Sequence, residues 1–183
     1  MNAETKSVEN VITSAATFML PLPDEAATQA LGRALGPLLA PGMVVWLDGD
    51  LGAGKTTLAR AVLRSLGYEG PVKSPTYTLV EFYVVSRLYL YHFDFYRFND
   101  PSEFEDAGLG EYFRDDTLCL VEWPDKAAGY VPAADLRIAF HFAGETGPES
   151  RPADGRRLVL HAYSTAGRQC LSSLRAGYSS AAN

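Results

Sequence analysis

The chain is poor in cysteine and histidine. Its 183 residues include two cysteines, Cys119 and Cys170, and no C-x-x-C pair. This argues against a disulfide scaffold and against a cysteine-based zinc site, and fits the reducing cytoplasm, where we expect the protein to reside. The three histidines lie in strand-like runs without a second ligand at metal-binding spacing, so we expect them to be structural.

Positive charge is also scarce. Lysine and arginine number 16 against 22 aspartates and glutamates, which gives a net charge of −6. Nucleic-acid-binding proteins usually present a basic face, so this balance is unfavourable for direct RNA binding, although it allows a local basic patch.

Long apolar runs are absent, and no stretch is long enough to span a bilayer. The N-terminal residues lack the basic start and apolar core of a signal peptide, and they show no periodicity. We therefore predict no membrane association and a disordered extension over residues 1–20. The remaining length suits one domain, residues 21–176, followed by a frayed tail at residues 177–183.

The most informative stretch is the glycine-rich loop GDLGAGKTT at residues 49–57, which matches G-x-x-x-x-G-K-[ST] at every fixed position. Glycines allow backbone N–H groups to converge on a phosphate, Lys55 can reach the β- and γ-phosphates, and Thr56 offers a hydroxyl to Mg²⁺. The alternative is a flexible loop between a strand and a helix, but an accidental match at four positions is rare. The predicted nucleotide-binding residues of this loop are Asp50, Leu51, Gly52, Ala53, Gly54, Lys55, Thr56 and Thr57.

The segments around this loop predict an α/β fold. It is a single P-loop NTPase-like domain with a mostly parallel central sheet, flanking helices and a late antiparallel hairpin. We expect helices over residues 25–39, 55–66, 101–113 and 167–175. We expect strands at 43–48 and 117–123, and hairpins formed by 74–85 with 87–98 and by 135–142 with 156–163.

Two acidic residues at strand ends are candidates for the rest of a nucleotide site. Glu122 ends the apolar strand TLCLVEW, and Asp94 lies among aromatic residues in YHFDFYR. P-loop enzymes place a carboxylate near the metal at the carboxyl end of a neighbouring strand, so we predict metal association for Glu122. Asp94 could hold an attacking or metal-bound water. The alternatives are a solvated strand end for Glu122 and an ion pair with Arg97 for Asp94.

Neighbouring polar residues leave more than one interpretation open. Ser74, Thr76 and Thr78 form a hydroxyl-rich loop that could sense a γ-phosphate or simply open a strand. Trp123 could stack on a base or a partner, or pack locally. No guanine-reading N-K-x-D motif is present, which favours ATP over GTP.

Taken together, five segments closely resemble the bacterial TsaE (YjeE) family. They are PLPDEAAT, GDLGAGKTT, VKSPTYTLVE, YHFDFYR and CLVEWPD, in this order and spacing. The resemblance runs from about residue 21 to residue 140. It implies a small P-loop ATPase that serves the threonylcarbamoyladenosine modification of tRNA. Such a protein acts in a complex with TsaB and TsaD, hydrolyses ATP to reset that complex and meets tRNA only indirectly.

The resemblance also implies residue roles. Lys55 and Thr56 match the residues that bind phosphate and Mg²⁺, and Glu122 matches a metal-associated glutamate. Asp94 matches an aspartate important for hydrolysis, and Thr76 matches a switch-like threonine. Finally, Glu25 and Arg156 fall where the family contacts the base or sugar side of the nucleotide.

Two rival functions use the same loop. A small-molecule kinase would need arginines that close over the phosphates, for which Arg87 and Arg97 are the few candidates. A binding module would hold the nucleotide as a structural ligand and act by docking alone. Phosphate transfer to a metabolite would favour the first, and tight ATP binding without hydrolysis would favour the second.

Overall fold

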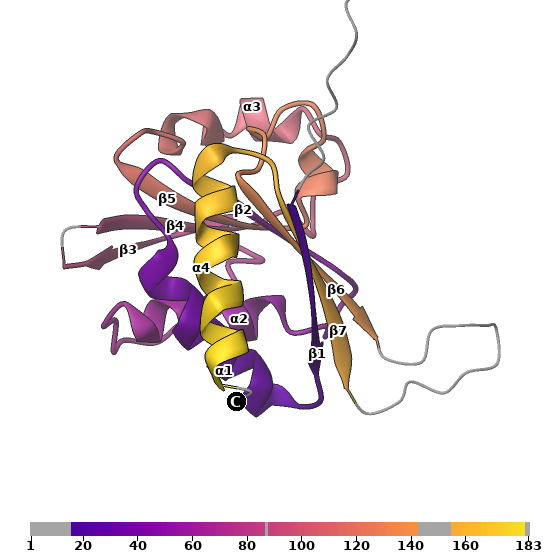
Figure 1. Ribbon diagram of the computed structural model, residues 1–183. Helices are drawn as coiled ribbons and strands as arrows, with labels where there is room; N and C mark the ends of the chain where they lie inside the picture. The colour runs from indigo at the N-terminus through magenta and orange to yellow at the C-terminus, as the bar shows by residue number, and fades with distance from the viewer. Residues whose placement is uncertain (1–15, 87, 143–154, 182–183) are drawn as a thin grey trace, which may run out of the picture.

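A computed structural model describes residues 16–86, 88–142 and 155–181. Seven strands form one sheet in the order β1-β7-β6-β2-β5-β4-β3 (Figure 1). Their bounds are Ala16–Leu22 (β1), Val44–Asp48 (β2), Val80–Val85 (β3), Leu88–Asp94 (β4), Thr117–Glu122 (β5), Leu136–Phe142 (β6) and Arg156–Ala162 (β7). The central strands β6, β2, β5 and β4 run parallel, whereas β3–β4, β6–β7 and β1–β7 are antiparallel pairs. The predicted α/β fold, including both hairpins, is confirmed.

Alternation along the strands divides the core into two layers. In β5, Leu118 and Leu120 face one layer, whereas Cys119 and Val121 face the other. The first layer packs against the helices α1 (Glu25–Leu35), α2 (Lys55–Ser65) and α4 (Thr165–Ala181). The second packs against α3 (Glu103–Asp106) and the short 3₁₀ helices η2 (Leu109–Tyr112) and η3 (Pro124–Ala127). A strand whose residues are apolar on both faces is typical of a sheet covered on both sides.

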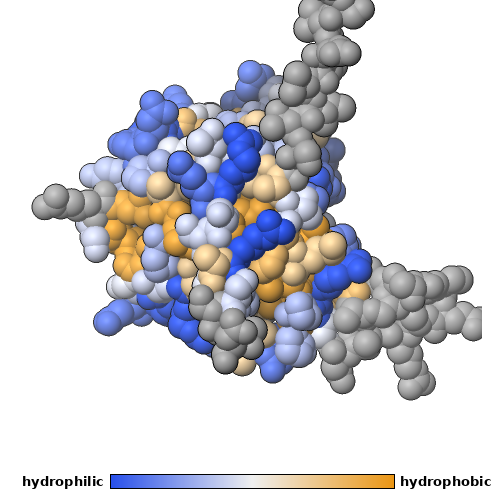
Figure 2. All heavy atoms as spheres, viewed as in Figure 1, coloured by the Kyte–Doolittle hydropathy of each residue, from blue (hydrophilic) through white to orange (hydrophobic). Residues whose placement is uncertain are grey.

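The surface of the α4 side is mixed in polarity. Figure 2 shows hydrophilic residues over much of this face, with hydrophobic residues between them. Within the described ranges, no helix is long and apolar enough to cross a membrane. Both cysteines are free thiols and are buried.

The predicted start of the folded part was wrong for residues 16–20. These residues belong to β1, which pairs with β7 along Ala16–Leu22 and buries Leu20 and Leu22. The strand escaped prediction because its partner lies about 140 positions away in the chain and five of its seven residues are half-buried or exposed. Residues 1–15 lie outside the described residues, so disorder there stays a prediction.

Three predicted helices have different bounds in the structure. The first is capped by the Asp24 side chain, but α1 ends at Leu35 and a 3₁₀ turn, η1 (Gly36–Leu38), follows. The helix predicted over 101–113 is two short pieces, because Gly108 adopts a left-handed conformation between them.

The last helix is longer at both ends than predicted. The prediction of a frayed tail from residue 177 was wrong for residues 177–181, which belong to α4. The Tyr178 ring packs edge-on against Phe18 of β1, with 6.1 Å between centroids. This contact gives the C-terminal turns of α4 a packing partner that the local sequence does not reveal.

Helices α1 and α2 approach very closely at small residues. A Cβ atom at Gly32 would lie 2.3 Å from Cβ of Ala61, and one at Gly36 would lie 1.9 Å from Oγ of Ser65. The two pairs repeat at a spacing of four residues, so they lie on one face of each helix. This contact fixes α1 against the helix that begins at the glycine-rich loop.

We predict that Gly32→Leu lowers the free energy of unfolding by about 1–3 kcal/mol, because the added side chain has no space against Ala61. Gly177→Ala in α4 is the matched control, since a Cβ there meets no atom within 4 Å. The control should leave stability unchanged or raise it by about 0.5–1 kcal/mol. Urea denaturation measures both, and equal stability of Gly32→Leu and wild type would contradict the close packing.

Candidate functional site

The glycine-rich loop connects the end of β2 to the start of α2. Gly54 is the N-cap of α2 and has φ +110°, and Gly49 has φ +137°, both in the left-handed region that favours glycine. A Cβ atom at Gly49 would also lie 2.8 Å from the Phe140 side chain and carbonyl. The backbone therefore curls tightly around the first turn of α2, whose unpaired N–H groups can bind an anion.

Lys55 is held inside this loop. Its Nζ donates hydrogen bonds to the carbonyls of Gly49 (2.6 Å) and Asp50 (2.9 Å), and it lies 4.0 Å from the centroid of the Trp123 ring. Burial lowers the pKa of Lys55, whereas the nearby carboxylates of Glu122 and Asp94 oppose that shift. The ammonium thus sits beside the loop with backbone and ring partners in place of a direct carboxylate ion pair.

Glu122 links the loop helix to the sheet. Its side chain is 3% exposed, and its Oε1 atom accepts hydrogen bonds from Thr56 Oγ1 (2.8 Å) and from His92 Nε2 (2.9 Å). In the register of the parallel strands, Glu122 is opposite both Leu47 of β2 and Asp94 of β4. The structure places Thr56, Asp94 and Glu122 together at the carboxyl edge of the sheet, as predicted.

Asp94 anchors the hydroxyl-rich loop. Its Oδ2 accepts hydrogen bonds from the hydroxyls of Ser74 and Thr76, the latter at 2.7 Å, and its Oδ1 accepts one from the Tyr96 backbone N–H at 3.0 Å. An Asp94–Arg97 ion pair is not found among the described residues. The Arg97 guanidinium lies instead over the Tyr77 ring, 4.1 Å from its centroid.

These groups surround one pocket with a volume of about 300 Å³. Its lining comprises Leu51, Gly52, Gly54, Lys55, Thr56, Thr57, Ser74, Thr76, Asp94, Tyr96, Glu122 and Trp123. Trp123 leaves β5 with φ +58°, an unusual conformation for a bulky residue, which turns its ring toward Lys55 and Tyr96. The pocket therefore combines a phosphate-type loop, one ammonium, two carboxylates and two aromatic rings.

The remaining candidate residues lie around the pocket rather than in its lining. The Asp50 carbonyl accepts a hydrogen bond from Lys55, and Ala53 is buried in the core beneath the loop. Arg156, the first residue of β7, donates from Nη2 to the Gly52 carbonyl at 3.1 Å, so it does touch the loop. Glu25 does not line the pocket. It begins α1 and accepts a hydrogen bond from Gln29 at 3.2 Å.

Comparison with known proteins identifies the family. Residues 22–151 match the family model described as threonylcarbamoyl adenosine biosynthesis protein TsaE. The chain belongs to the TsaE family. The tRNA threonylcarbamoyladenosine biosynthesis protein TsaE of Haemophilus influenzae is 39% identical over 156 residues, which cover 82% of this chain and 93% of that protein. The corresponding Bacillus subtilis protein is 42% identical over 118 residues, covering 64% and 73% respectively.

A solved structure agrees with this assignment. The crystal structure of Bacillus subtilis YdiB superposes with a TM-score of 0.73 at 28% sequence identity, covering 89% of this chain and 97% of that one. The resemblance to TsaE predicted from five short segments is therefore confirmed. TsaE family membership supports a role in the biosynthesis of threonylcarbamoyladenosine in tRNA.

His92 is the site residue of this TsaE protein that sequence reasoning missed. It is fully buried on β4 and hydrogen-bonded to Glu122, and its second ring nitrogen, Nδ1, is buried without a partner. A usable signal was present, because residues two apart in a strand share a face and His92 precedes Asp94 by two. The residue expected to be structural thus contacts the central carboxylate of the site.

This geometry predicts the proton position on His92. Because Nε2 faces a carboxylate oxygen and Nδ1 has no partner, we expect the ring to carry its proton on Nε2. Long-range ¹H–¹⁵N correlation spectra of ¹⁵N-labelled protein at neutral pH report the tautomer. His141, which is exposed on β6, serves as an internal reference. A His92 ring protonated at Nδ1 would contradict the arrangement.

Proposed function

We propose that this TsaE protein binds ATP with Mg²⁺ and hydrolyses it in support of tRNA threonylcarbamoyladenosine formation, acting together with TsaB and TsaD in the cytoplasm. The observation that carries the proposal is the Thr56–Glu122 hydrogen bond. It joins the hydroxyl of the G-x-x-x-x-G-K-T loop to a buried carboxylate at the end of β5. This pairing is typical of sites in which a hydroxyl and a carboxylate organise a metal beside nucleotide phosphates.

The residues of the pocket fit these ligands. The left-handed glycines and the start of α2 favour phosphate oxygens, and the Lys55 ammonium adds a positive charge at the loop. Within the described residues, no group of three or more His, Cys, Asp or Glu side chains could hold a metal by itself. This suits Mg²⁺, which keeps several waters and takes other ligands from phosphates rather than from a protein cage. Thr56 and Glu122 are the residues that would hold it.

Each residue has a distinct task in this mechanism. When bound, Mg²⁺ would neutralise charge that builds up on the phosphates. Lys55, already oriented by two carbonyls, would move its ammonium the short distance to the β- and γ-phosphate oxygens. Asp94 would accept a hydrogen bond from the attacking water. The hydrogen bonds from Ser74 and Thr76 to Asp94 would make the loop that carries them responsive to the γ-phosphate.

Two further residues would contact the rest of the nucleotide. Arg156 lies against the Gly52 carbonyl, and its Nε is buried without a partner, so it has donor capacity to spare. Glu25 stands at the start of α1, and we keep it as a contact to the base or sugar side on the strength of the family resemblance alone.

The pocket explains why partners would be needed. Lys55 is the only cationic side chain among its lining residues in the described part of the chain. Phosphoryl transfer is faster by orders of magnitude when an additional arginine stabilises the transition state, and such a residue can come from another protein. We therefore expect slow ATP hydrolysis by the isolated chain and faster hydrolysis in the presence of TsaB and TsaD. With a net charge of −6, the protein would leave most contact with tRNA to its partners.

We predict that TsaB and TsaD accelerate ATP hydrolysis by this chain, and that Glu122→Ala lowers the accelerated rate at least about tenfold, because Thr56 and His92 lose their shared acceptor. The measurement is steady-state phosphate release with and without the partners. Glu111→Ala, which removes an exposed carboxylate from η2, is the control and should behave as wild type.

Other results would contradict the proposal in different ways. Equal hydrolysis with and without TsaB and TsaD would contradict the partner dependence. Phosphate transfer to a metabolite would favour a kinase, and tight ATP binding with no hydrolysis under any condition would favour a binding module.

A further inference from the structure

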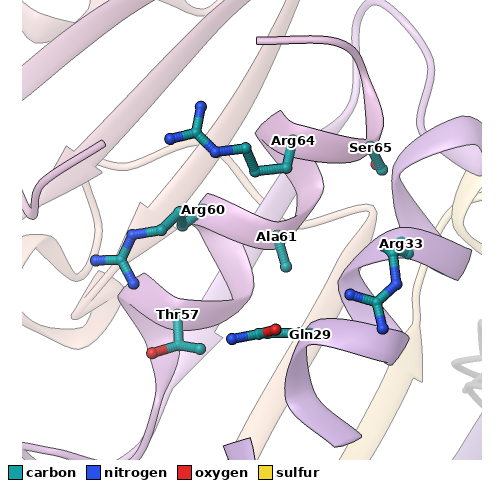
Figure 3. A pocket seen from close by; sticks show the side chains of 7 residues that line it. All are labelled: Gln29, Arg33, Thr57, Arg60, Ala61, Arg64 and Ser65. Carbon is teal, nitrogen blue, oxygen red and sulfur yellow. The ribbon is translucent and has the colours of Figure 1, made fainter. Parts of the chain in front are cut away.

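A second cavity lies between α1 and α2, next to the pocket but separate from it. Its volume is about 330 Å³, and its lining includes Gln29 and Arg33 from α1 and Thr57, Arg60, Ala61 and Arg64 from α2. In Figure 3, Arg33 extends from α1, the Arg60 and Arg64 side chains extend from α2 toward the side away from α1, and the Gln29 side chain points toward Thr57. We call this cavity the arginine groove. No aspartate or glutamate lines it.

Within the part of the chain that the structure describes, the three arginines form no ion pair with an acidic side chain. The ion pairs between arginine and acidic side chains in the described residues lie elsewhere, at Arg114–Asp116 and Arg137–Asp48. Arg60 donates from Nε to the Val72 carbonyl, and Arg64 donates from Nη1 to the Tyr68 carbonyl. One donor of each guanidinium is thereby anchored, and the other donors remain available to a ligand.

The groove is also preorganised. Gly32 and Gly36 contact Ala61 and Ser65 directly, so α1 and α2 have little freedom to move relative to each other. Each arginine stands next in sequence to one of these packed residues: Arg33 beside Gly32, Arg60 beside Ala61 and Arg64 beside Ser65. The helix backbones that carry these planar cations are therefore held at a fixed separation, which reduces the conformational entropy lost when a carboxylate or phosphate ligand binds.

We infer that the arginine groove docks an acidic segment of a protein partner. The charge of the groove favours an anionic occupant. Three arginines without an ion-pair partner among the described residues line this one site of an acidic chain. The charges around the groove favour a short segment over a long polyanion. Glu25 is hydrogen-bonded to Gln29 at the groove, so a negative charge already stands beside it. A long polyanion such as RNA would extend past that charge along a chain whose net charge is −6, whereas a few carboxylates fit within the groove.

The position of the groove connects docking to the nucleotide. Thr57 lines both the groove and the nucleotide pocket, and α2 begins at Lys55 and carries Arg60 and Arg64. A segment bound in the groove therefore contacts the helix whose first turn would hold phosphate. The inference rests on the proposed function in one respect: it takes the partner to be the TsaB–TsaD complex.

The test is the affinity of the double variant Arg33→Glu/Arg64→Glu for purified TsaB–TsaD, measured by biolayer interferometry with ATP and Mg²⁺ present. We expect at least a tenfold loss relative to wild type, and a smaller loss for Arg33→Gln/Arg64→Gln, which removes charge without reversing it. Arg168→Glu/Arg175→Glu on α4 makes the same change of net charge away from the groove and should bind as wild type. Thermal unfolding and fluorescent-nucleotide binding, both expected to be unchanged, show that the variants are folded.

Three outcomes would overturn the inference. Equal partner affinity of wild type and both groove variants would overturn it while leaving the proposed function intact. An equal loss in the α4 control would show a general charge effect. Binding of tRNA alone to wild type, lost in the groove variants, would make nucleic acid the occupant. Failure of wild type to bind TsaB–TsaD is a separate result, because it contradicts the partnership itself.

Discussion

The candidate site depends on a single carboxylate oxygen. Oε1 of Glu122 accepts hydrogen bonds from a hydroxyl on α2 and from a ring nitrogen on β4, so one atom on β5 ties three elements together. Parallel pairing makes this possible, because β2, β5 and β4 all end at the same edge of the sheet. The register then sets Asp94 beside Glu122 and brings both within reach of the loop that follows β2.

The close contact of α1 with α2 extends this constraint outward. The glycines of α1 let the two helix backbones approach until small side chains touch, so α2 is supported from the side as well as from the sheet. A helix that is held along its length keeps its first turn in place, and that turn carries Lys55 and Thr56. The same contact spaces the arginines of the groove. The helix packing, the position of the glycine-rich loop and the spacing of the groove thus depend on the same contact.

The sequence predicted local features well and long-range contacts poorly. The glycine-rich loop and the strand-ending carboxylates could be recognised, because their chemistry depends on residues a few positions apart. Strand β1 and the end of α4 could not, because each is stabilised by a partner more than 100 positions away, as in the Phe18–Tyr178 contact. The contact of His92 with Glu122 escaped prediction for a similar reason. The importance of His92 comes from a glutamate 30 residues further along, on the neighbouring strand.

The central claim is that the loop around Lys55 binds nucleotide phosphates, and calorimetric titration of ATP into the purified protein tests it most directly. The account predicts that wild type binds ATP and that Mg²⁺ strengthens binding. Lys55→Ala should weaken binding by at least about thirtyfold, the equivalent of about 2 kcal/mol for losing a buried charged contact. Equal affinity of wild type and Lys55→Ala would contradict the account, since the phosphate site would then lie elsewhere.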